Sequence, residues 1–240
     1  MIVVLRRTSF IFTGFTQEML DFMLDIRFNN NKTFMAENRN DYIRVMRAPY
    51  YALIDHLAPT MLEINANMEV RPNKCLSRIF RDARFSKDKS PYRDHHWVAF
   101  RQAGIPRESA PMYWMEVRVE KVSWGLGFWG ENKKAMEHMR RRMVAKPKEF
   151  SALNALLKKN DFALAGEDYK RLKVPDDLNP AVADWYPKKE LLFVKEKIDP
   201  AIIFTPAFAD TLAEDFKALA PVYHLMQGSY ELALNEGEIS

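Results

Sequence analysis

The stretch that decides the fold reads YWMEVRVEKVSWGLGFW, from Tyr113 to Trp129. Apolar residues occupy every second position on both sides of Lys121, at Tyr113, Met115, Val117 and Val119 and again at Val122, Trp124, Leu126 and Phe128. A period of two is typical of a β-strand, whose side chains point to alternate faces. Because so short a link joins the two runs, the stretch predicts an antiparallel hairpin.

Further strands are expected on either side of this hairpin. Residues 97–100 predict another strand of the same sheet, and residues 191–194 predict a buried strand. Strands are expected to begin near Met68.

Helices are expected before and after the sheet. Apolar residues with helical spacing predict a helix from the capping residue Thr16 to about Phe28, followed by a break at residues 29–31. A second pattern over residues 42–61 contains Pro49 and Pro59, each expected to cause a kink or a new helix start. Further helices are predicted from residue 131, from Pro147 and after the pair Thr205-Pro206.

These patterns predict an α+β fold with a central, mainly antiparallel sheet that includes a hairpin at 113–129, flanked by N-terminal and C-terminal helices. With 48% apolar residues and neither a repeat nor a Gly/Ser linker, the chain is expected to form a single domain over residues 1–240. Residues 1–9 are interpreted as an N-terminal extension, and residues 231–240 as a loose acidic tail.

Positive charge is concentrated in two segments. Residues 71–93 hold eight Lys or Arg against two Asp, and residues 133–148 hold seven against one Glu, although the whole chain carries only +4. Local clustering determines field strength, so this division favours an anionic partner at one place over general coating of nucleic acid. The simpler alternative is that both basic segments are solvated surfaces without an anionic partner.

The first basic segment carries the candidate site. Because an Arg side chain binds phosphate or carboxylate through two parallel bonds, a small anionic ligand is predicted as the partner. The predicted ligand-binding residues are Arg78, Arg81, Arg84, Ser86, Lys87, Lys89 and Tyr92. The alternative is that Asp82 and Asp88 pair with these cations and the segment is an internal ion network, within a structural module or one that binds protein or nucleic acid.

Whether a reaction is catalysed stays open from the sequence. The candidates for a proton carrier are Asp82, Asp88 and His95, because a buried carboxylate or a histidine can exchange protons near neutral pH. No spacing of His, Cys or acidic residues is typical of a metal site, so no metal is expected, and no cofactor is indicated.

Other features point away from competing classes. Residues 125–130 spell G-x-G-x-x-G, but they follow a hairpin rather than a parallel βαβ unit, so close packing is the favoured interpretation. Cys75 stands alone and no apolar run reaches ~20 residues, which favours a cytoplasmic protein without a membrane span. The apolar start ends at Arg6-Arg7, unlike a signal peptide. Nucleic acid is a less favoured partner, and the oligomeric state is not indicated.

The basic segment also carries a family resemblance. Arg81-Asp82, Arg84-Phe85-Ser86 and Asp88 to Tyr92 form a motif that resembles a family of conserved hypothetical proteins, a domain of unknown function. The resemblance extends over most of the chain, from the first predicted helix through the hairpin to Trp185-Tyr186-Pro187. It implies a single domain with this motif at its centre, and no established activity, substrate or cofactor.

Overall fold

The computed structural model describes residues 11–82, 84, 87–197 and 200–236. Backbone contacts divide the chain into two compact units. Unit 1 contains the described residues up to Ala99, with Met115–Ser123 and Glu196–Ala213, and unit 2 contains the remaining described residues. Single-domain behaviour stays a prediction, and each unit is described by itself below. The predicted extension at residues 1–9 lies outside the described residues.

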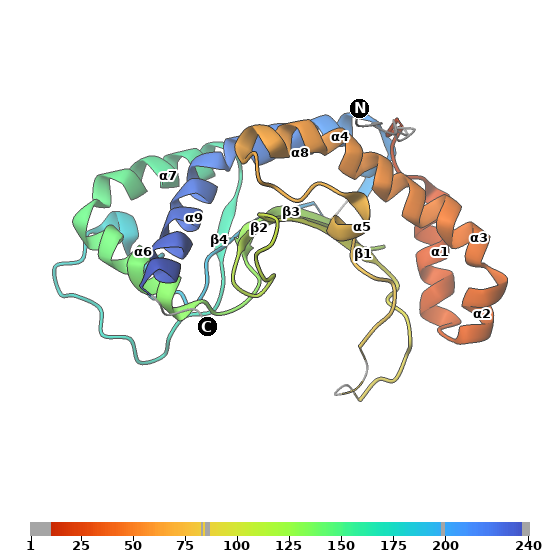
Figure 1. Ribbon diagram of the computed structural model, residues 1–240, viewed down its shortest axis with the longest axis horizontal. Coiled ribbons are helices and arrows are strands. Elements are labelled where there is room, and N and C mark those ends of the chain that lie inside the picture. Colours follow the sequence, from red (N-terminus) through yellow and green to blue (C-terminus); the bar gives the residue numbers. More distant parts are fainter. Residues whose placement is uncertain (1–10, 83, 85–86, 198–199, 237–240) are drawn as a thin grey trace, which may run out of the picture. The chain divides into compact units, whose positions relative to one another are not determined.

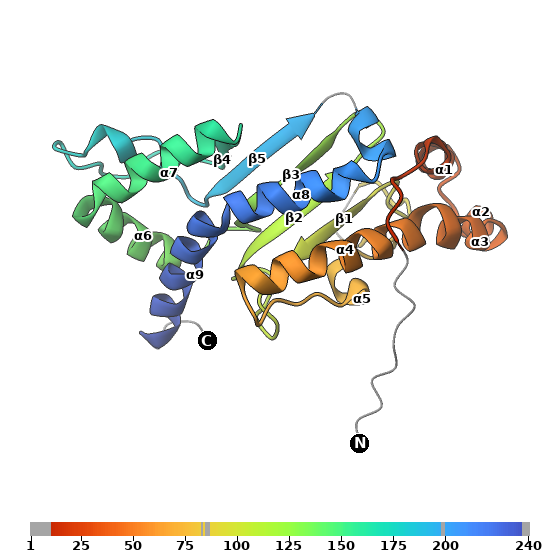
Figure 2. The same ribbon diagram turned by 90° about the horizontal axis from the view of Figure 1, so that it is seen from above.

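The sheet has five strands in the order β1-β2-β3-β5-β4 and is antiparallel. Its strands are β1 His96–Phe100, β2 Pro111–Val117, β3 Val122–Phe128, β4 Ala163–Ala165 and β5 Leu192–Lys197. Every residue of β3 is buried, and Figure 2 shows β2 and β3 side by side. The predicted α+β fold, the hairpin and the strand at 97–100 are therefore confirmed.

Two glycines of β3 explain the G-x-G-x-x-G spelling. A Cβ atom on Gly125 would lie 1.8 Å from the carbonyl oxygen of Phe193, and one on Gly127 would lie 2.7 Å from that of Leu191. Only a residue without a side chain allows the backbone of β5 to approach so closely. Around Gly130, by contrast, a Cβ would meet nothing within 4 Å. The geometry agrees with the packing interpretation.

Unit 1 opens with a series of helices, shown in orange and red in Figure 1. They are α1 Gln17–Phe28, α2 Lys32–Glu37, α3 Arg39–Asp41, the π-helix η1 Tyr42–Arg47, α4 Ala48–Ile64 and α5 Pro72–Cys75. The Thr16 side chain accepts a hydrogen bond from the backbone of Met19, which confirms the predicted start of α1. Asn31 caps α2 in the same way through Phe34, so the predicted break separates two capped helices.

The expected position of the first strand was wrong. The first strand of the sheet begins at His96, not near Met68, because the described residues between them pair through isolated bridges, Leu76 with Val98 and Phe80 with Tyr92. Of the two prolines expected to cause a kink or a new helix start, Pro49 lies in the first turn of α4, and Pro59 lies inside α4 without starting a new helix. Seven residues of α4 are buried, and tertiary packing of that kind outweighs the local cost of one proline.

The helices of unit 2 follow the predicted pattern. They are α6 Lys133–Ala145, α7 Pro147–Lys159, the 3₁₀ turn η2 Pro180–Val182 and α9 Ala220–Asn235, while η3 Pro200–Phe204 belongs to unit 1 and α8 Ala207–Ala218 begins there. α6 packs against both α7 and α9, as Figure 2 shows. The expected loose tail is helical as far as Asn235, and residues 237–240 lie outside the described part. No described helix is long and apolar enough to cross a membrane.

Candidate functional site

The basic segment forms an irregular hairpin in unit 1. The backbone N–H of Arg93 donates to the carbonyl of Ile79 over 2.8 Å, and that of Arg81 donates to the carbonyl of Pro91 over 2.9 Å. Beyond these bonds the chain makes a loop, drawn in yellow in Figure 1, where it extends away from α5. Lys87 and Lys89 are exposed on this loop, and Ser86 lies outside the described residues.

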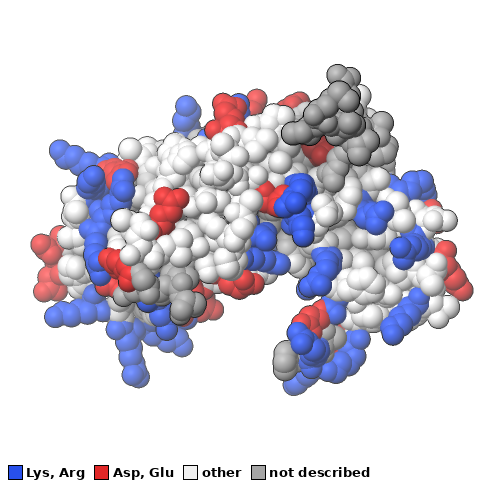
Figure 3. All heavy atoms as spheres, in the orientation of Figure 1, with Lys and Arg blue, Asp and Glu red and all other residues white. Residues whose placement is uncertain are grey.

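Both acidic residues of the loop pair with arginines of the same loop. Asp82 binds the guanidinium of Arg84 at 2.7 Å, and Asp88 binds that of Arg81. Figure 3 shows blue and red atoms together at the outer end of this loop. The bonds from Arg84 lower the pKa of Asp82 to about 2, and bonds from Ser90 and then Arg81 lower that of Asp88 to about 2. Two of the predicted ligand-binding arginines therefore already face a carboxylate.

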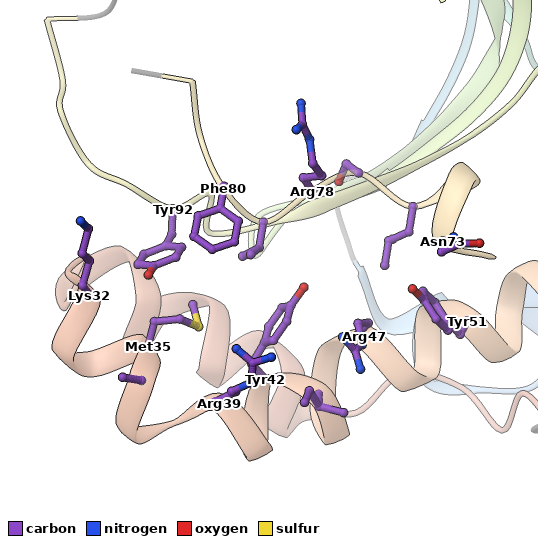
Figure 4. Close-up of a pocket in the computed structure, with 15 residues that line it drawn as sticks. Lys32, Met35, Arg39, Tyr42, Arg47, Tyr51, Asn73, Arg78, Phe80 and Tyr92 are labelled. Atoms are coloured by element: carbon purple, nitrogen blue, oxygen red, sulfur yellow. The ribbon is translucent and has the colours of Figure 1, made fainter. Parts of the chain in front are cut away.

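Other residues of the segment line a cavity. Arg78 and Tyr92, both predicted to bind ligand, contribute to a cavity of about 450 Å³, with Phe80 between them in the sequence. The opposite wall comes from α2, α3, η1 and α4, as Figure 4 shows. All lining residues belong to unit 1. Of the predicted residues, Arg81, Arg84, Lys87 and Lys89 do not line this cavity.

The charges around the cavity have one sign. Among the described residues, four cationic ones line it, namely Lys32, Arg39, Arg47 and Arg78, and no Asp or Glu does. Figure 4 shows Arg39 and Arg47 on the helical wall, whereas the Arg78 side chain rises from the opposite wall, away from the helices. An aqueous cavity with several cations and no carboxylate has a positive potential, which attracts anions.

These four cations lack a carboxylate partner within the described part of the chain. None of them takes part in an ion pair there, and the guanidinium of Arg47 lies 5.9 Å from the ring centre of Tyr51. Arg44, in the same turn as Arg47, is different: it binds Glu18 at 2.6 Å and Asp41 at 2.9 Å. Neighbouring arginines of one helix thus divide into a paired outer one and a cavity-facing one.

The residues of the helical wall are regularly spaced in the sequence. Met35, Arg39, Ile43, Arg47 and Tyr51 follow one another at intervals of four residues, and all five line the cavity. In an α-helix of 3.6 residues per turn such a row drifts around the helix. The π-helical turn accommodates extra residues, since the N–H of Ala48 bonds to the carbonyl of Ile43, five residues earlier. This wider turn keeps the row on one face.

A buried histidine stands behind the cavity wall. His96 is fully buried, with Nε2 3.1 Å from the hydroxyl of Tyr42 and Nδ1 3.0 Å from the hydroxyl of Ser77. Ser77 also accepts a bond from the backbone N–H of Trp97 over 3.1 Å. Burial lowers the pKa of His96 to about 3 and raises that of Tyr42 to about 12. The imidazole is therefore neutral near pH 7, and the phenol keeps its proton.

The hydrogen-bonded series Tyr42–His96–Ser77 leaves one hydroxyl hydrogen available to the cavity, because a neutral imidazole has one N–H and one lone pair. If Nδ1 of His96 carries the hydrogen, it donates to Ser77, Tyr42 donates to Nε2, and the Ser77 hydrogen is unused. In the other tautomer the Tyr42 hydrogen is unused. Both hydroxyl residues line the cavity, so either tautomer offers one neutral donor beside the cations.

Aromatic rings close the strand side of the cavity. Phe80 and Tyr92 pair across the hairpin with ring centres 5.3 Å apart. The side chain of Asn30 fixes this pair: its Nδ2 donates to the carbonyl of Tyr92 over 2.9 Å, and its Oδ1 accepts from the N–H of Tyr92 over 3.0 Å. The turn between α1 and α2 thereby holds one wall of the cavity in place.

His95, a candidate proton carrier, lies outside the cavity in a cluster of charges. Its Nδ1 is 2.5 Å from Asp94 and its Nε2 is 3.2 Å from Glu116. Arg27 binds Asp94, and Arg118 binds Glu116 at 2.8 Å. Burial lowers the pKa of His95, but the bonds to its two carboxylates outweigh burial and raise it above the ordinary value. Asp82 and Asp88, the other candidates, do not line the cavity either.

The second basic segment, in unit 2, is largely engaged by the protein itself. Arg140 donates to the carbonyls of Tyr186 and Lys188, over 2.9 and 2.6 Å. The guanidinium groups of the next two residues bind Glu137 and Glu149, each at 2.7 Å. Arg140 connects α6 to residues 186–188, Arg142 connects it to α7, and the pair of Arg141 with Glu137 lies within α6. The described residues include no group of three or more His, Cys, Asp or Glu placed to hold a metal ion.

Sequence reasoning missed the helical wall of the cavity. The residues it did not select are Lys32, Arg39, Tyr42, Arg47, Tyr51, Ser77 and His96. The signal that could have identified part of this wall is the repeated interval of four from Arg39 to Tyr51, beside the apolar row that defines the helix. The density of charge in the sequence pointed instead to the loop at residues 81–90, where Arg81 and Arg84 are paired with carboxylates.

Comparisons with known proteins give a family and no relative of known activity. A search of the curated proteins found no similar sequence. The family model described as conserved hypothetical protein (DUF2461) matches residues 18–225, a range that includes every residue lining the cavity. The match spans most of the 240 residues and confirms the resemblance of the basic motif. The chain belongs to the DUF2461 family of conserved hypothetical proteins.

Proposed function

We propose that this protein binds a small phosphorylated or carboxylated ligand in the cavity of unit 1. The observation that carries the proposal is the lining of four cations without a carboxylate, none of them ion-paired within the described residues. A cation held near others of like charge is stabilised by an anion more than by water alone. The basic motif supplies Arg78 and Tyr92 to this site, and the helices supply Lys32, Arg39 and Arg47.

The chemistry of the wall suits an oxyanion. Arg39 and Arg47 offer planar groups that can each make two parallel hydrogen bonds to a phosphate or carboxylate. The hydrogen-bonded series Tyr42–His96–Ser77 adds one neutral hydroxyl donor. A phosphate has enough acceptor oxygens to use all of these donors at once. The proposal concerns binding, because Asp82, Asp88 and His95 do not line the cavity.

One observation supports a second function. The loop beyond Phe80 is exposed, and its arginines pair with Asp82 and Asp88. Such a loop can act as an ordered surface for a protein or nucleic acid, with the ion pairs fixing its shape. In that case the cavity would hold no ligand, and the loop alone would carry the function.

Thermal unfolding in the presence of inorganic phosphate and pyrophosphate tests the choice. A ligand at 100 times its dissociation constant stabilises the folded state by about 2.7 kcal/mol, a shift of several degrees for a chain of this size. We expect the double variant Arg39→Gln, Arg47→Gln to lose this shift. The matched control is Arg44→Gln, which removes a neighbouring arginine that faces Glu18 and Asp41.

A third variant separates the cavity from the loop. Arg84→Gln changes an exposed arginine of the loop and leaves the cavity lining intact. We expect it to keep the wild-type shift with both anions. Loss of the shift in Arg84→Gln, with retention in the double variant, would overturn the assignment to the cavity. The absence of any shift in the wild-type protein at millimolar anion would overturn binding altogether.

The cytoplasm is the compartment we propose for this activity. The single cysteine, Cys75, is buried, and its thiol donates to the carbonyl of Glu69 over 3.1 Å. A chain with one cysteine gains no internal disulfide from an oxidising compartment.

A further inference from the structure

We propose that the ligand of this cavity is a phosphate ester that also carries a planar aromatic ring, as a nucleoside monophosphate does. This inference rests on the proposed function and adds the class of ligand. It follows from the side chains on the two walls of the cavity, since Arg39 and Arg47 lie on the helical wall and Phe80 and Tyr92 lie on the wall across from it.

The aromatic wall includes a ring with an uncovered surface. Phe80 is 65% exposed, although it lines the cavity and pairs with the buried ring of Tyr92. The pairing covers part of the Phe80 ring and leaves the rest open. Aromatic side chains in this arrangement accept the flat face of a heterocycle, and a stacked base is worth about 1–3 kcal/mol by alanine substitution. Phe80 is therefore placed to bind a ring.

The two walls are distinct in space. In Figure 4, Phe80 and Tyr92 stand on the strand side, while Arg39 and Arg47 lie on the helices across from them, with the Tyr42 hydroxyl pointing into the space between. A ligand that reaches both walls needs an anionic end and an aromatic end. The volume of about 450 Å³ lies within the range of about 300–1,000 Å³ that is typical of sites for whole small molecules.

The cavity also offers polar side chains to the remainder of such a ligand. Ser77 and Asn73 line the cavity, and both can bond to hydroxyl groups. A free inorganic anion would bind only to the cations and to the hydroxyl donor of the series Tyr42–His96–Ser77. It would leave Phe80 and the rest of the aromatic wall without a function in binding.

Equilibrium titrations with matched probes test the inference. The probes are adenosine 5′-monophosphate, ribose 5-phosphate, which lacks the ring, and adenosine, which lacks the phosphate. We expect the wild-type protein to bind adenosine 5′-monophosphate at least about fivefold more tightly than ribose 5-phosphate, in line with one stacked ring. Adenosine alone should bind more weakly than adenosine 5′-monophosphate, because it cannot engage Arg39 and Arg47.

Variants assign the difference to the aromatic wall. Phe80→Leu should bring the affinity for adenosine 5′-monophosphate close to that for ribose 5-phosphate and change the latter less than twofold. The control is Phe28→Leu at the end of α1, which changes a phenylalanine that is 79% exposed and does not line the cavity. It should leave all three affinities unchanged. Because Phe80 is exposed, its variant should fold, and its melting temperature will verify this.

The outcomes separate the two proposals. Equal wild-type affinities for adenosine 5′-monophosphate and ribose 5-phosphate would overturn the aromatic inference and leave anion binding intact. So would a preference that survives in Phe80→Leu. If none of the probes that carry a phosphate binds, both the inference and the proposed function fail.

Discussion

His95 and His96 are neighbours in the sequence whose surroundings drive their pKa values in opposite directions. His96 is buried between two hydroxyl groups, and burial lowers its pKa to about 3. His95 lies between Asp94 and Glu116, whose bonds to it outweigh burial and raise its pKa. His95 directly precedes β1 and His96 is its first residue, so the two rings point to different sides of the chain, one toward the cavity wall and the other toward the cluster of charges.

The raised pKa of His95 gives a pH dependence with a definite sign. A histidine whose pKa is higher in the folded than in the unfolded protein adds stability below the unfolded value of about 6.5 and loses it as pH rises through the folded value. We therefore expect the free energy of unfolding of the wild type, relative to His95→Gln, to decrease between pH 6 and pH 9. Urea unfolding at several pH values measures this difference.

A control separates this effect from the loss of any histidine. His56→Gln removes an exposed histidine that pairs with Asp210 at 3.0 Å, and exposed ion pairs contribute only about 0–1 kcal/mol. Its difference from the wild type should stay small throughout the pH range. A wild-type advantage over His95→Gln that grows with pH would contradict the role of the two carboxylates.

At the scale of single elements, the return strand of the hairpin depends on Gly125. An alanine there would place its Cβ 1.8 Å from the carbonyl oxygen of Phe193, so β5 would have to move away from β3. We expect Gly125→Ala to destabilise the protein by more than about 3 kcal/mol, since overpacking against fixed backbone costs more than contact with flexible side chains. The melting temperature and the urea midpoint measure the loss.

Gly130→Ala is the matched control for this strand. Nothing lies within 4 Å of the added Cβ, and the backbone there is not in the left-handed region. Its stability should stay within about 0.5 kcal/mol of the wild type. Similar losses in both glycine variants would show that the close approach of β5 is not what requires glycine at 125.

Elements were predictable where one local signal dominates. The alternation over residues 113–129 and the cap at Thr16 act within a few residues, and the structure has the expected hairpin and helix there. Pro59 shows the limit of such signals, because its cost is local while the burial that overrides it comes from the rest of the fold. The expectation of a strand near Met68 failed because pairing depends on partners distant in the sequence, and Leu76 meets β1 through a single bridge to Val98.

At the scale of the whole molecule, the candidate site could be predicted only in part. Charge density identified the segment that holds Arg78 and Tyr92. It could not show which of its arginines meet Asp82 and Asp88, because that depends on how the loop turns. Nor could it join this segment to residues 32–51, which reach the cavity only through the packing of helices against the hairpin.

The distribution of charge also bears on nucleic acid as a partner. A protein that binds single-stranded nucleic acid releases counterions, and the logarithm of its affinity falls with that of salt by about 0.7 for each phosphate neutralised. An arginine already paired with a carboxylate contributes less to this release. Arginines of both basic segments are paired in this way, including Arg81, Arg84, Arg141 and Arg142. The wild-type protein should therefore bind single strands weakly.

A single-stranded 20-mer of thymidine, titrated at several salt concentrations, measures this slope. We expect a wild-type slope shallower than about −2, which corresponds to fewer than three phosphates. The double variant Asp82→Asn, Asp88→Asn frees Arg84 and Arg81 from their carboxylates, and it should steepen the slope by up to about 1.4. Its own control is Asp41→Asn, which changes an acidic partner of Arg44 on the helical side. A wild-type slope of about −4 or steeper would instead favour the loop as a nucleic-acid surface, since only unpaired cations release so many counterions.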